Sequence, residues 1–183
     1  MNLMHTEVER VLLRREAIAA RVRELGRTIS SERDMERPLL AVTILKGAAI
    51  FAADLVREIS GPVAMDFMAV SSYGTAAKSS GAVRIVKDLD ETVAGKDVLL
   101  IEDILDTGLT LRYLREYLLG QGPRSLKVCV LLDKLDRHQV NVDIDYIGFR
   151  IPDAFVVGYG LDYAGRYRNV PDVLALRAEA VDE

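Results

Sequence analysis

Short and almost wholly apolar runs recur along the chain and restrict its fold more than any other feature. Each has the length of a strand that is buried on both faces. The runs are residues 39–45, 63–70, 97–101 and 125–132. Stretches with apolar residues at helical spacing stand before and between them, at 15–31, 46–60 and 107–120. This alternation predicts an α/β fold with a mainly parallel sheet.

The composition restricts the class of protein. The 183 residues suffice for one domain with a sizeable core, and 50% of them are hydrophobic. The net charge of −4 argues against nucleic-acid binding, because phosphate neutralisation needs a basic surface. No apolar run approaches the ~20 residues of a membrane span, and the first ten residues lack the apolar stretch of a secretory signal. The single cysteine, Cys129, is expected to be a buried core thiol. We therefore expect a cytoplasmic protein that binds neither nucleic acid nor membrane.

Three acids follow the apolar run at 97–101. They are Glu102, Asp103 and Asp106. We expect them just beyond the carboxyl end of a strand, where ligands bind in open α/β sheets. Vicinal hydroxyls of a sugar could donate hydrogen bonds to Glu102 and Asp103. The alternative is that the acids cap the following helix, and this alternative is strongest for Asp106.

The residues after Asp106 predict a phosphate site. They are Thr107, Gly108, Leu109 and Thr110. The first N–H groups of a helix are unpaired and carry the positive end of its dipole, and the two threonine hydroxyls add donors. Together with the acids, this segment fits a ribose 5-phosphate.

The segment 98–111 resembles the phosphoribosyl pyrophosphate motif of the type I phosphoribosyltransferases, with four apolar residues, two acids, two apolar residues and then Asp-Thr-Gly-x-Thr. Other segments resemble the hypoxanthine–guanine members in the same order. Residues 45–48 are similar to their pyrophosphate loop, 72–74 to their mobile hood loop, and 132–134 with 151–163 to their purine pocket. The resemblance implies the type I phosphoribosyltransferase fold, with a twisted sheet flanked by helices. It also implies one domain over 1–183, with a small hood formed by the N-terminal and C-terminal segments.

The same resemblance assigns roles to individual residues. Asp106 would be the general base or acid. The residues implied to bind phosphoribosyl pyrophosphate are Lys46, Gly47, Ser72, Tyr73, Glu102, Asp103, Asp106, Thr107, Gly108, Leu109, Thr110 and Arg168. Those implied to bind the purine are Lys134, Phe155, Val156 and Asp162. Mg²⁺ would be the cofactor, with Glu102 and Asp103 as metal residues, and Asp162 could hold a second Mg²⁺ through water. The peptide between residues 45 and 46 is often cis in this family.

Each of these assignments has a plain structural alternative. Lys46 could be a solvated lysine in a strand–helix turn, and residues 71–81 could be a surface loop. Lys134 could extend from a strand end into solvent, and Phe155 could belong to the core. Arg166 competes with Arg168 for the pyrophosphate contact. His138 has no partner at metal-ligand spacing and is expected at the surface.

The resemblance implies an enzyme of purine salvage that forms IMP or GMP from phosphoribosyl pyrophosphate and hypoxanthine or guanine. Its partners would be these small molecules, and it would assemble as a homodimer or homotetramer. A transferase of other specificity, for xanthine or a pyrimidine, remains an alternative. So do a non-catalytic regulator on the same fold and a Mg²⁺-dependent phosphatase, although the phosphatase gives no role to Lys134 or Phe155.

Overall fold

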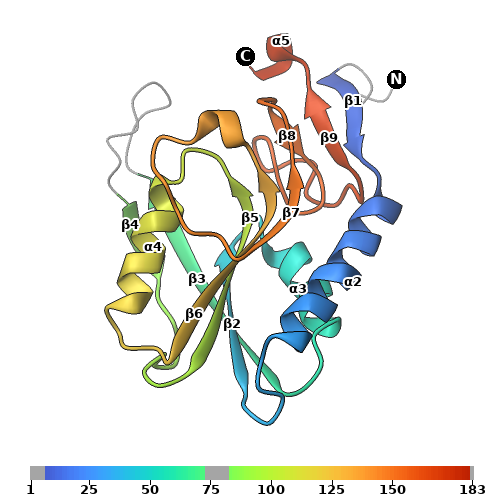
Figure 1. The fold of residues 1–183 in the computed structure, drawn as a ribbon. Helices are drawn as coiled ribbons and strands as arrows, with labels where there is room; N and C mark the ends of the chain where they lie inside the picture. The colour runs from blue at the N-terminus through green and yellow to red at the C-terminus, as the bar shows by residue number, and fades with distance from the viewer. Residues whose placement is uncertain (1–6, 73–82, 182–183) are drawn as a thin grey trace.

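A six-stranded sheet forms the centre of the computed structural model, which describes residues 7–72 and 83–181 (Figure 1). Its strands stand in the order β4-β3-β2-β5-β6-β7, and every neighbouring pair is parallel except β3 and β4. The strands are β2 (Leu39–Leu45), β3 (Val63–Ser72), β4 (Val83–Lys87), β5 (Asp97–Leu105), β6 (Ser125–Asp133) and β7 (Tyr146–Arg150). The predicted α/β class with a mainly parallel sheet is confirmed.

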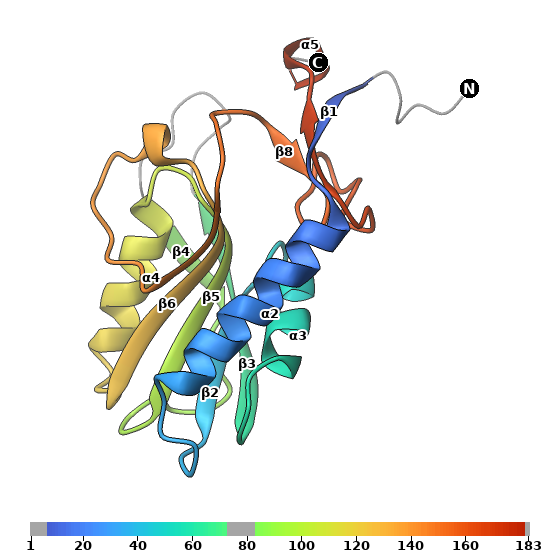
Figure 2. The same ribbon diagram turned by 45° about the vertical axis from the view of Figure 1, so that its right-hand side comes forward.

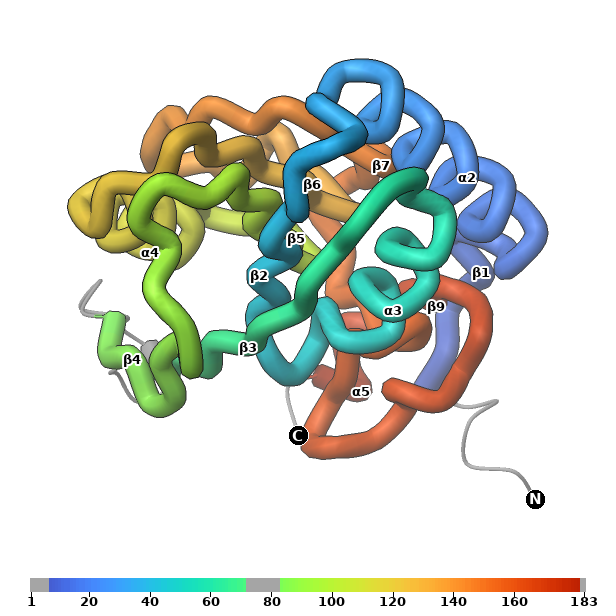
Figure 3. The backbone as a smooth tube through the Cα atoms, turned by 90° about the horizontal axis from the view of Figure 1, so that it is seen from below, coloured from blue at the N-terminus to red at the C-terminus, as the bar shows by residue number. Residues whose placement is uncertain are grey.

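Helices cover both faces of this sheet. Helices α2 (Arg15–Ser31) and α3 (Ala49–Arg57) lie on one face, and α4 (Leu109–Leu119) lies on the other (Figures 2 and 3). The stripe on α2 buries Ile18 and Val22 in one core cluster, while Leu114 of α4 is buried in a second cluster on the opposite face. Each helix therefore buries the apolar stripe that its spacing predicts. Cys129 is buried, as expected, and desolvation raises the pKa of its thiol.

Strand β5 is longer than the sequence predicts, which corrects the expected position of two acids. Its pairing with β2 ends at Thr43 opposite Ile101, whereas its pairing with β6 continues to Leu105 opposite Asp133. Glu102 and Asp103 therefore lie within β5 and not beyond its end. They occupy the part of the strand that no longer pairs with β2.

A second sheet is built from the two ends of the chain. It has three antiparallel strands in the order β1-β9-β8, namely β1 (Val8–Leu13), β9 (Val173–Leu176) and β8 (Val156–Val157). The sequence analysis predicts neither β1 nor β9, and it treats the last part of the chain as irregular. A short 3₁₀ helix, η1 (Leu135–Arg137), and a terminal helix, α5 (Ala178–Val181), complete the fold. The second sheet lies beyond the carboxyl ends of the central strands (Figure 1), where a hood is expected.

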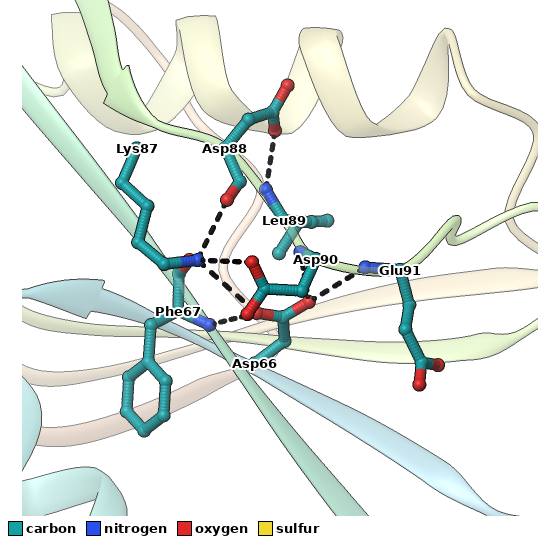
Figure 4. Close-up of polar contacts among 7 residues, drawn as sticks. All are labelled: Asp66, Phe67, Lys87, Asp88, Leu89, Asp90 and Glu91. Atoms are coloured by element: carbon teal, nitrogen blue, oxygen red, sulfur yellow. Dashed lines mark hydrogen bonds and ion pairs between the residues drawn. The ribbon is translucent and has the colours of Figure 1, made fainter.

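A buried carboxylate fixes the connection between β4 and β5 (Figure 4). Asp66 of β3 is only 5% exposed, and its two oxygens accept the backbone N–H groups of Phe67 at 2.7 Å, Asp90 at 2.8 Å and Glu91 at 3.3 Å. The ammonium of Lys87 donates to the carbonyl oxygen of Phe67 at 3.0 Å and stands 3.8 Å from the Asp66 carboxylate. The cluster holds the 88–91 segment against the edge of the central sheet.

No helix in residues 7–72 and 83–181 is both long enough and apolar enough to cross a membrane.

Arg21 of α2 is part of a contact between this helix and the central sheet. Its guanidinium donates to the carbonyl oxygens of Ile147 at 2.8 Å and Gly148 at 3.0 Å, and so it joins α2 to β7.

Candidate active site

A cavity of about 340 Å³ lies at the carboxyl ends of β2, β5 and β6. Its wall brings together residues that are far apart in the sequence. They are Lys46, Gly47, Asp103, Ile104, Asp106, Lys134, Phe155, Val156, Leu161, Asp162 and Arg168. Nine of these eleven are residues that the sequence analysis proposes for the site, and Ile104 and Leu161 are apolar additions to its wall.

The turn after β2 presses against the acids of β5. The Leu45–Lys46 peptide is cis, as is often the case in the family that the sequence resembles. A Cβ atom on Gly47 would overlap the carboxylate of Asp103, so only glycine allows the turn and the carboxylate to approach this closely. Lys46 lines the cavity beside them.

Glu102 and Asp103 place two carboxylates side by side. Burial raises the pKa of Glu102 well above its ordinary value, and the charge of Asp103 raises it further. Burial likewise raises the pKa of Asp103. The N–H of Asp103 donates to a Glu102 carboxylate oxygen at 3.2 Å and the charge of Arg168 favours ionised Asp103, and further donors or a cation would favour the charged forms of both acids.

The carboxylates fit Mg²⁺ only as a partial ligand set. Oxygen ligands suit this ion, which is usually held by one or two carboxylates together with substrate oxygens. Within the described part of the chain, no three His, Cys, Asp or Glu side chains converge on one point. An ion held by Glu102 and Asp103 would therefore need oxygens of the substrate to complete its ligand set.

The start of α4 has a small cavity of its own, of about 80 Å³. Glu102, Asp106, Thr107, Gly108 and Thr110 line it, together with apolar residues of β5 and α4. Helix α4 begins at Leu109, two residues later than predicted, because Gly108 adopts a left-handed φ of 84° before it. Gly108 occupies the cap position, and the hydroxyl of Thr107, not an acid, accepts the N–H of Leu109 at 3.4 Å. The alternative in which the acids are helix caps is therefore wrong.

The residues proposed to bind the purine line the 340 Å³ cavity. Lys134 is 8% exposed and its ammonium stands 3.8 Å from the carboxylate of Asp153, so it does not extend into solvent. Phe155 is 39% exposed and lines the cavity, so it is not a core residue. The structure thus favours the site interpretation over the plain alternative for both residues.

Arg168 and Asp162 enter the cavity as an ion pair. The guanidinium of Arg168 contacts the Asp162 carboxylate at 2.6 Å and donates to the carbonyl oxygen of Gly160 at 2.7 Å. The second oxygen of Asp162 accepts the N–H of Gly165 at 2.8 Å. Arg168 also lines a larger cavity of about 630 Å³ between α2 and α3. Arg166, its competitor in the sequence analysis, does not line the 340 Å³ cavity.

Two predicted residues cannot be placed fully. Ser72 ends β3, and Tyr73 lies outside the described residues, as does most of the expected hood loop. The residues 71–72 belong to β3 and not to a loop, which corrects the boundary predicted there.

The sequence analysis missed a group of charges around η1. Arg137 donates to the Asp106 carboxylate at 3.1 Å and stands 3.8 Å from Asp153, which in turn pairs with Lys134. His138 is not a free surface residue, because its Nε2 lies 2.7 Å from the carboxylate of the buried Asp133. The charged run after the apolar segment at 125–132 was the only available signal for these contacts.

A family model for the phosphoribosyl transferase domain matches residues 11–164 of the chain. This chain belongs to the phosphoribosyl transferase family. The match covers the central sheet and every cavity-lining residue except Arg168.

Relatives of known name narrow the position within the phosphoribosyl transferase family. The chain is 51% identical over 164 residues to the hypoxanthine-guanine phosphoribosyltransferase of Aquifex aeolicus, which covers 90% of this chain and 92% of the relative. It is 49% identical over 175 residues to the enzyme of the same name from Bacillus subtilis, covering 96% and 97%. A crystal structure of a hypoxanthine phosphoribosyltransferase from Staphylococcus aureus superposes with a TM-score of 0.90 at 44% identity, covering 97% and 96%. The predicted type I phosphoribosyltransferase fold is confirmed.

Proposed function

We propose that this chain is a purine-salvage transferase, which moves the 5-phosphoribosyl group from phosphoribosyl pyrophosphate to hypoxanthine or guanine. The products would be IMP or GMP and pyrophosphate. The observation that carries the proposal is the one cavity in which Lys46, Asp106 and Lys134 meet, since these residues come from three separate motifs. Relatives that cover most of the chain carry the name hypoxanthine-guanine phosphoribosyltransferase, which supports this choice of substrates.

Asp106 would act as the general base. A 6-oxopurine carries a proton on an imidazole nitrogen, and removal of this proton makes the base a better nucleophile. N9 of the purine would attack C1′ of the ribose, the bond from C1′ to the pyrophosphate oxygen would break, and the proton on N7 would pass to the Asp106 carboxylate. The side chain of Asp106 is 42% exposed, so a purine in the cavity can reach it.

Lys134 and Phe155 would select and hold the base. The ammonium of Lys134 can donate to the carbonyl oxygen O6 of hypoxanthine or guanine, whereas the amino group of adenine presents donors and would leave the lysine unpaired. A mismatch of this kind at a buried polar group gives strong discrimination. Phe155 offers an exposed ring on the same wall for stacking. Backbone groups of Val156 and Asp162 would contact the other edge of the base.

The ribosyl donor would occupy the side of the site formed by β5 and α4. The N–H groups at the start of α4 and the hydroxyls of Thr107 and Thr110 would hold the 5′-phosphate, while Glu102 and Asp103 would accept hydrogen bonds from the ribose hydroxyls. Lys46, Gly47 and Arg168 would face the pyrophosphate. Bound Mg²⁺ would neutralise the leaving pyrophosphate, with Glu102 and Asp103 among its ligands.

The direct test supplies the purified chain with Mg²⁺, phosphoribosyl pyrophosphate and, in turn, hypoxanthine, guanine, xanthine and adenine. We expect IMP and GMP to form and AMP to be absent or formed very slowly, as separated by liquid chromatography. Preferential turnover of xanthine would indicate the alternative specificity. Tight binding of phosphoribosyl pyrophosphate without turnover of any base would indicate a regulator.

Two variants test the assigned roles. Asp106→Asn should lower kcat roughly 10²-fold or more, the usual contribution of a positioned base, while the exposed Asp143→Asn serves as a control. Lys134→Gln should raise the KM for hypoxanthine and narrow the discrimination against adenine. Full turnover by Asp106→Asn would remove this residue from the mechanism.

We also propose that the protein assembles as a homodimer or homotetramer. Light scattering on the protein as it elutes from a size-exclusion column measures its mass.

A further inference from the structure

Arg166 lies outside the cavity, yet its side chain makes several close contacts with aromatic and acidic side chains. Its guanidinium carbon lies 5.7 Å from the ring centroid of Tyr163 and 5.5 Å from that of Tyr167, so the cation stands over two aromatic faces. One guanidinium nitrogen also contacts a carboxylate oxygen of Glu7 at 3.0 Å. The planar guanidinium of arginine can stack on aromatic faces while its nitrogens also pair with a carboxylate.

Glu7 holds this arrangement from the other end of the chain. Its side chain is 20% exposed, and its second oxygen accepts a hydrogen bond from the hydroxyl of Tyr167. This hydrogen bond and the contact with Arg166 hold the pKa of Glu7 below its ordinary value. Residue 7 immediately precedes β1, and its carbonyl oxygen accepts the N–H of Arg177 after β9, so the carboxylate is anchored to the second sheet.

The turn that carries Arg166 is rigid. Tyr163 and Arg166 exchange two backbone hydrogen bonds, of 3.0 and 3.3 Å, across a turn in which Ala164 and Gly165 have φ values of 50° and 78°. Asp162 closes the same turn through the N–H of Gly165 at 2.8 Å. The position of Arg166 is therefore tied directly to that of Tyr163.

Tyr163 in turn supports the exposed aromatic wall of the cavity. Its ring meets that of Phe155 edge to face, with centroids 5.4 Å apart and planes at 81°. Its hydroxyl donates to the carbonyl oxygen of Val181 in α5 at 3.3 Å. Phe155 is 39% exposed, so close packing of the core does not restrict its ring from every side, and contact with Tyr163 is a principal constraint.

We propose that Glu7 and Arg166 form a clamp that positions Tyr163 and, through it, the Phe155 ring on which the purine stacks. Glu7 and Arg166 are positioning residues, because neither lines the cavity. The inference rests on the proposed function, since it assigns Phe155 to the base. It makes the affinity for the purine depend on a residue at the N-terminal edge of the second sheet.

The first test measures steady-state kinetics of Arg166→Gln and Glu7→Gln in the full chain. We expect each variant to raise the KM for hypoxanthine about 3- to 10-fold, with kcat and the KM for phosphoribosyl pyrophosphate changed less than about 2-fold. The double variant should be no worse than either single one, because both changes open the same clamp. Arg166→Lys should be intermediate, since lysine keeps the charge and loses the planar stack. Glu9→Gln is the matched control, because Glu9 lies in β1, two residues after Glu7, and its carboxylate pairs with the exposed Arg10.

The outcomes separate the clamp from its rivals. A rise in the KM for phosphoribosyl pyrophosphate alone would overturn the clamp and place Arg166 at the pyrophosphate. Unchanged kinetics in both variants would also overturn it. If the wild-type chain turns over none of the bases, the proposed function fails and so does the role in purine binding. Amide hydrogen exchange across 155–163 then decides whether the clamp exists as a structural element, because faster exchange in Arg166→Gln but not in Glu9→Gln supports it and unchanged exchange excludes it.

Discussion

Glu102 is a carboxyl whose surroundings disfavour its charged form. It lies in β5 beside Asp103, and desolvation and the neighbouring charge raise its pKa well above the ordinary value. A protein selected only for stability would replace one of these carboxylates with a neutral side chain. Their retention is understandable where a ligand supplies donors or a cation in exchange, as the proposed ribosyl donor would.

Glu102→Gln should raise the Tm of the ligand-free chain by a few degrees at pH 7, corresponding to about 1–2 kcal/mol, because it removes a carboxylate whose charged form the site disfavours. A carboxyl whose folded-state pKa is raised stabilises the fold below its unfolded pKa, and this stability is lost as pH rises through the raised folded value. The advantage of the variant should therefore shrink as pH falls toward about 4.5.

Thermal unfolding followed by circular dichroism from pH 4.5 to 8 measures this effect. The KM for phosphoribosyl pyrophosphate should rise in the same variant, since the ribose and the metal would lose a ligand. Glu36→Gln provides a control at an exposed carboxyl that precedes the amino end of β2, whereas the site lies at the carboxyl end of this strand. A Tm at pH 7 that falls in Glu102→Gln would show that the Glu102 charge is compensated in the ligand-free protein.

At the scale of elements, the central strands and helices follow from local patterns. Strand β2 and helix α2 have the predicted bounds, because each is a continuous apolar run or a clear helical stripe. The predicted end of β5, at residue 101, is wrong because acidic residues usually follow a buried strand and do not continue it. The strand extends to Leu105. Their strand conformation depends on the ladder with β6, which continues four residues beyond the last pairing with β2. The sequence of β5 alone does not show that its ladder with β6 is longer than its ladder with β2.

The second sheet could not be predicted from local patterns, for a different reason. Strand β1 alternates weakly, with the exposed Glu9 and Arg10 in its middle, and its stability comes from pairing with β9 at the other end of the chain. The residues of the site were recognisable from their motifs, whereas the contacts of Arg137, Arg166 and Glu7 were not. Those contacts arise when distant segments fold together, and no local spacing encodes them.

The Asp66 cluster gives the prediction at this scale. Asp66→Ala should lower the free energy of unfolding by about 2–3 kcal/mol, because backbone N–H groups of Phe67, Asp90 and Glu91 lose a buried charged acceptor. Urea unfolding measures the loss. The control is Asp90→Ala, which removes a contact of Lys87 with a carboxylate whose side chain is 79% exposed and should change stability by less than about 0.5 kcal/mol. Equal stability of Asp66→Ala and the wild type would mean that water replaces the carboxylate.

At the scale of the whole molecule, the site is built from residues of both sheets and of segments that are far apart in the sequence. The central sheet supplies the turn after β2, the acids of β5 and Lys134 after β6, while the segment around β8 supplies Phe155 and Val156. The second sheet is held by pairing of β1 with β9, which come from opposite ends of the described chain (Figure 1). A ligand that spans the cavity would therefore link the two sheets.

This linkage leads to a prediction about ligand-dependent stability. Mg²⁺ with phosphoribosyl pyrophosphate at about 100 times the Kd should stabilise the fold by about 2.7 kcal/mol, which for a chain of this size raises the Tm by roughly 5–10 °C. Mg²⁺ alone should give a much smaller shift, because the described side chains offer no three-residue metal site. Phosphoribosyl pyrophosphate with EDTA should also fall short, since Glu102 and Asp103 would then face its pyrophosphate without a cation between them. Differential scanning calorimetry of these three conditions and of the ligand-free chain tests this order. A full shift with Mg²⁺ alone would show that the protein binds the metal without its substrate.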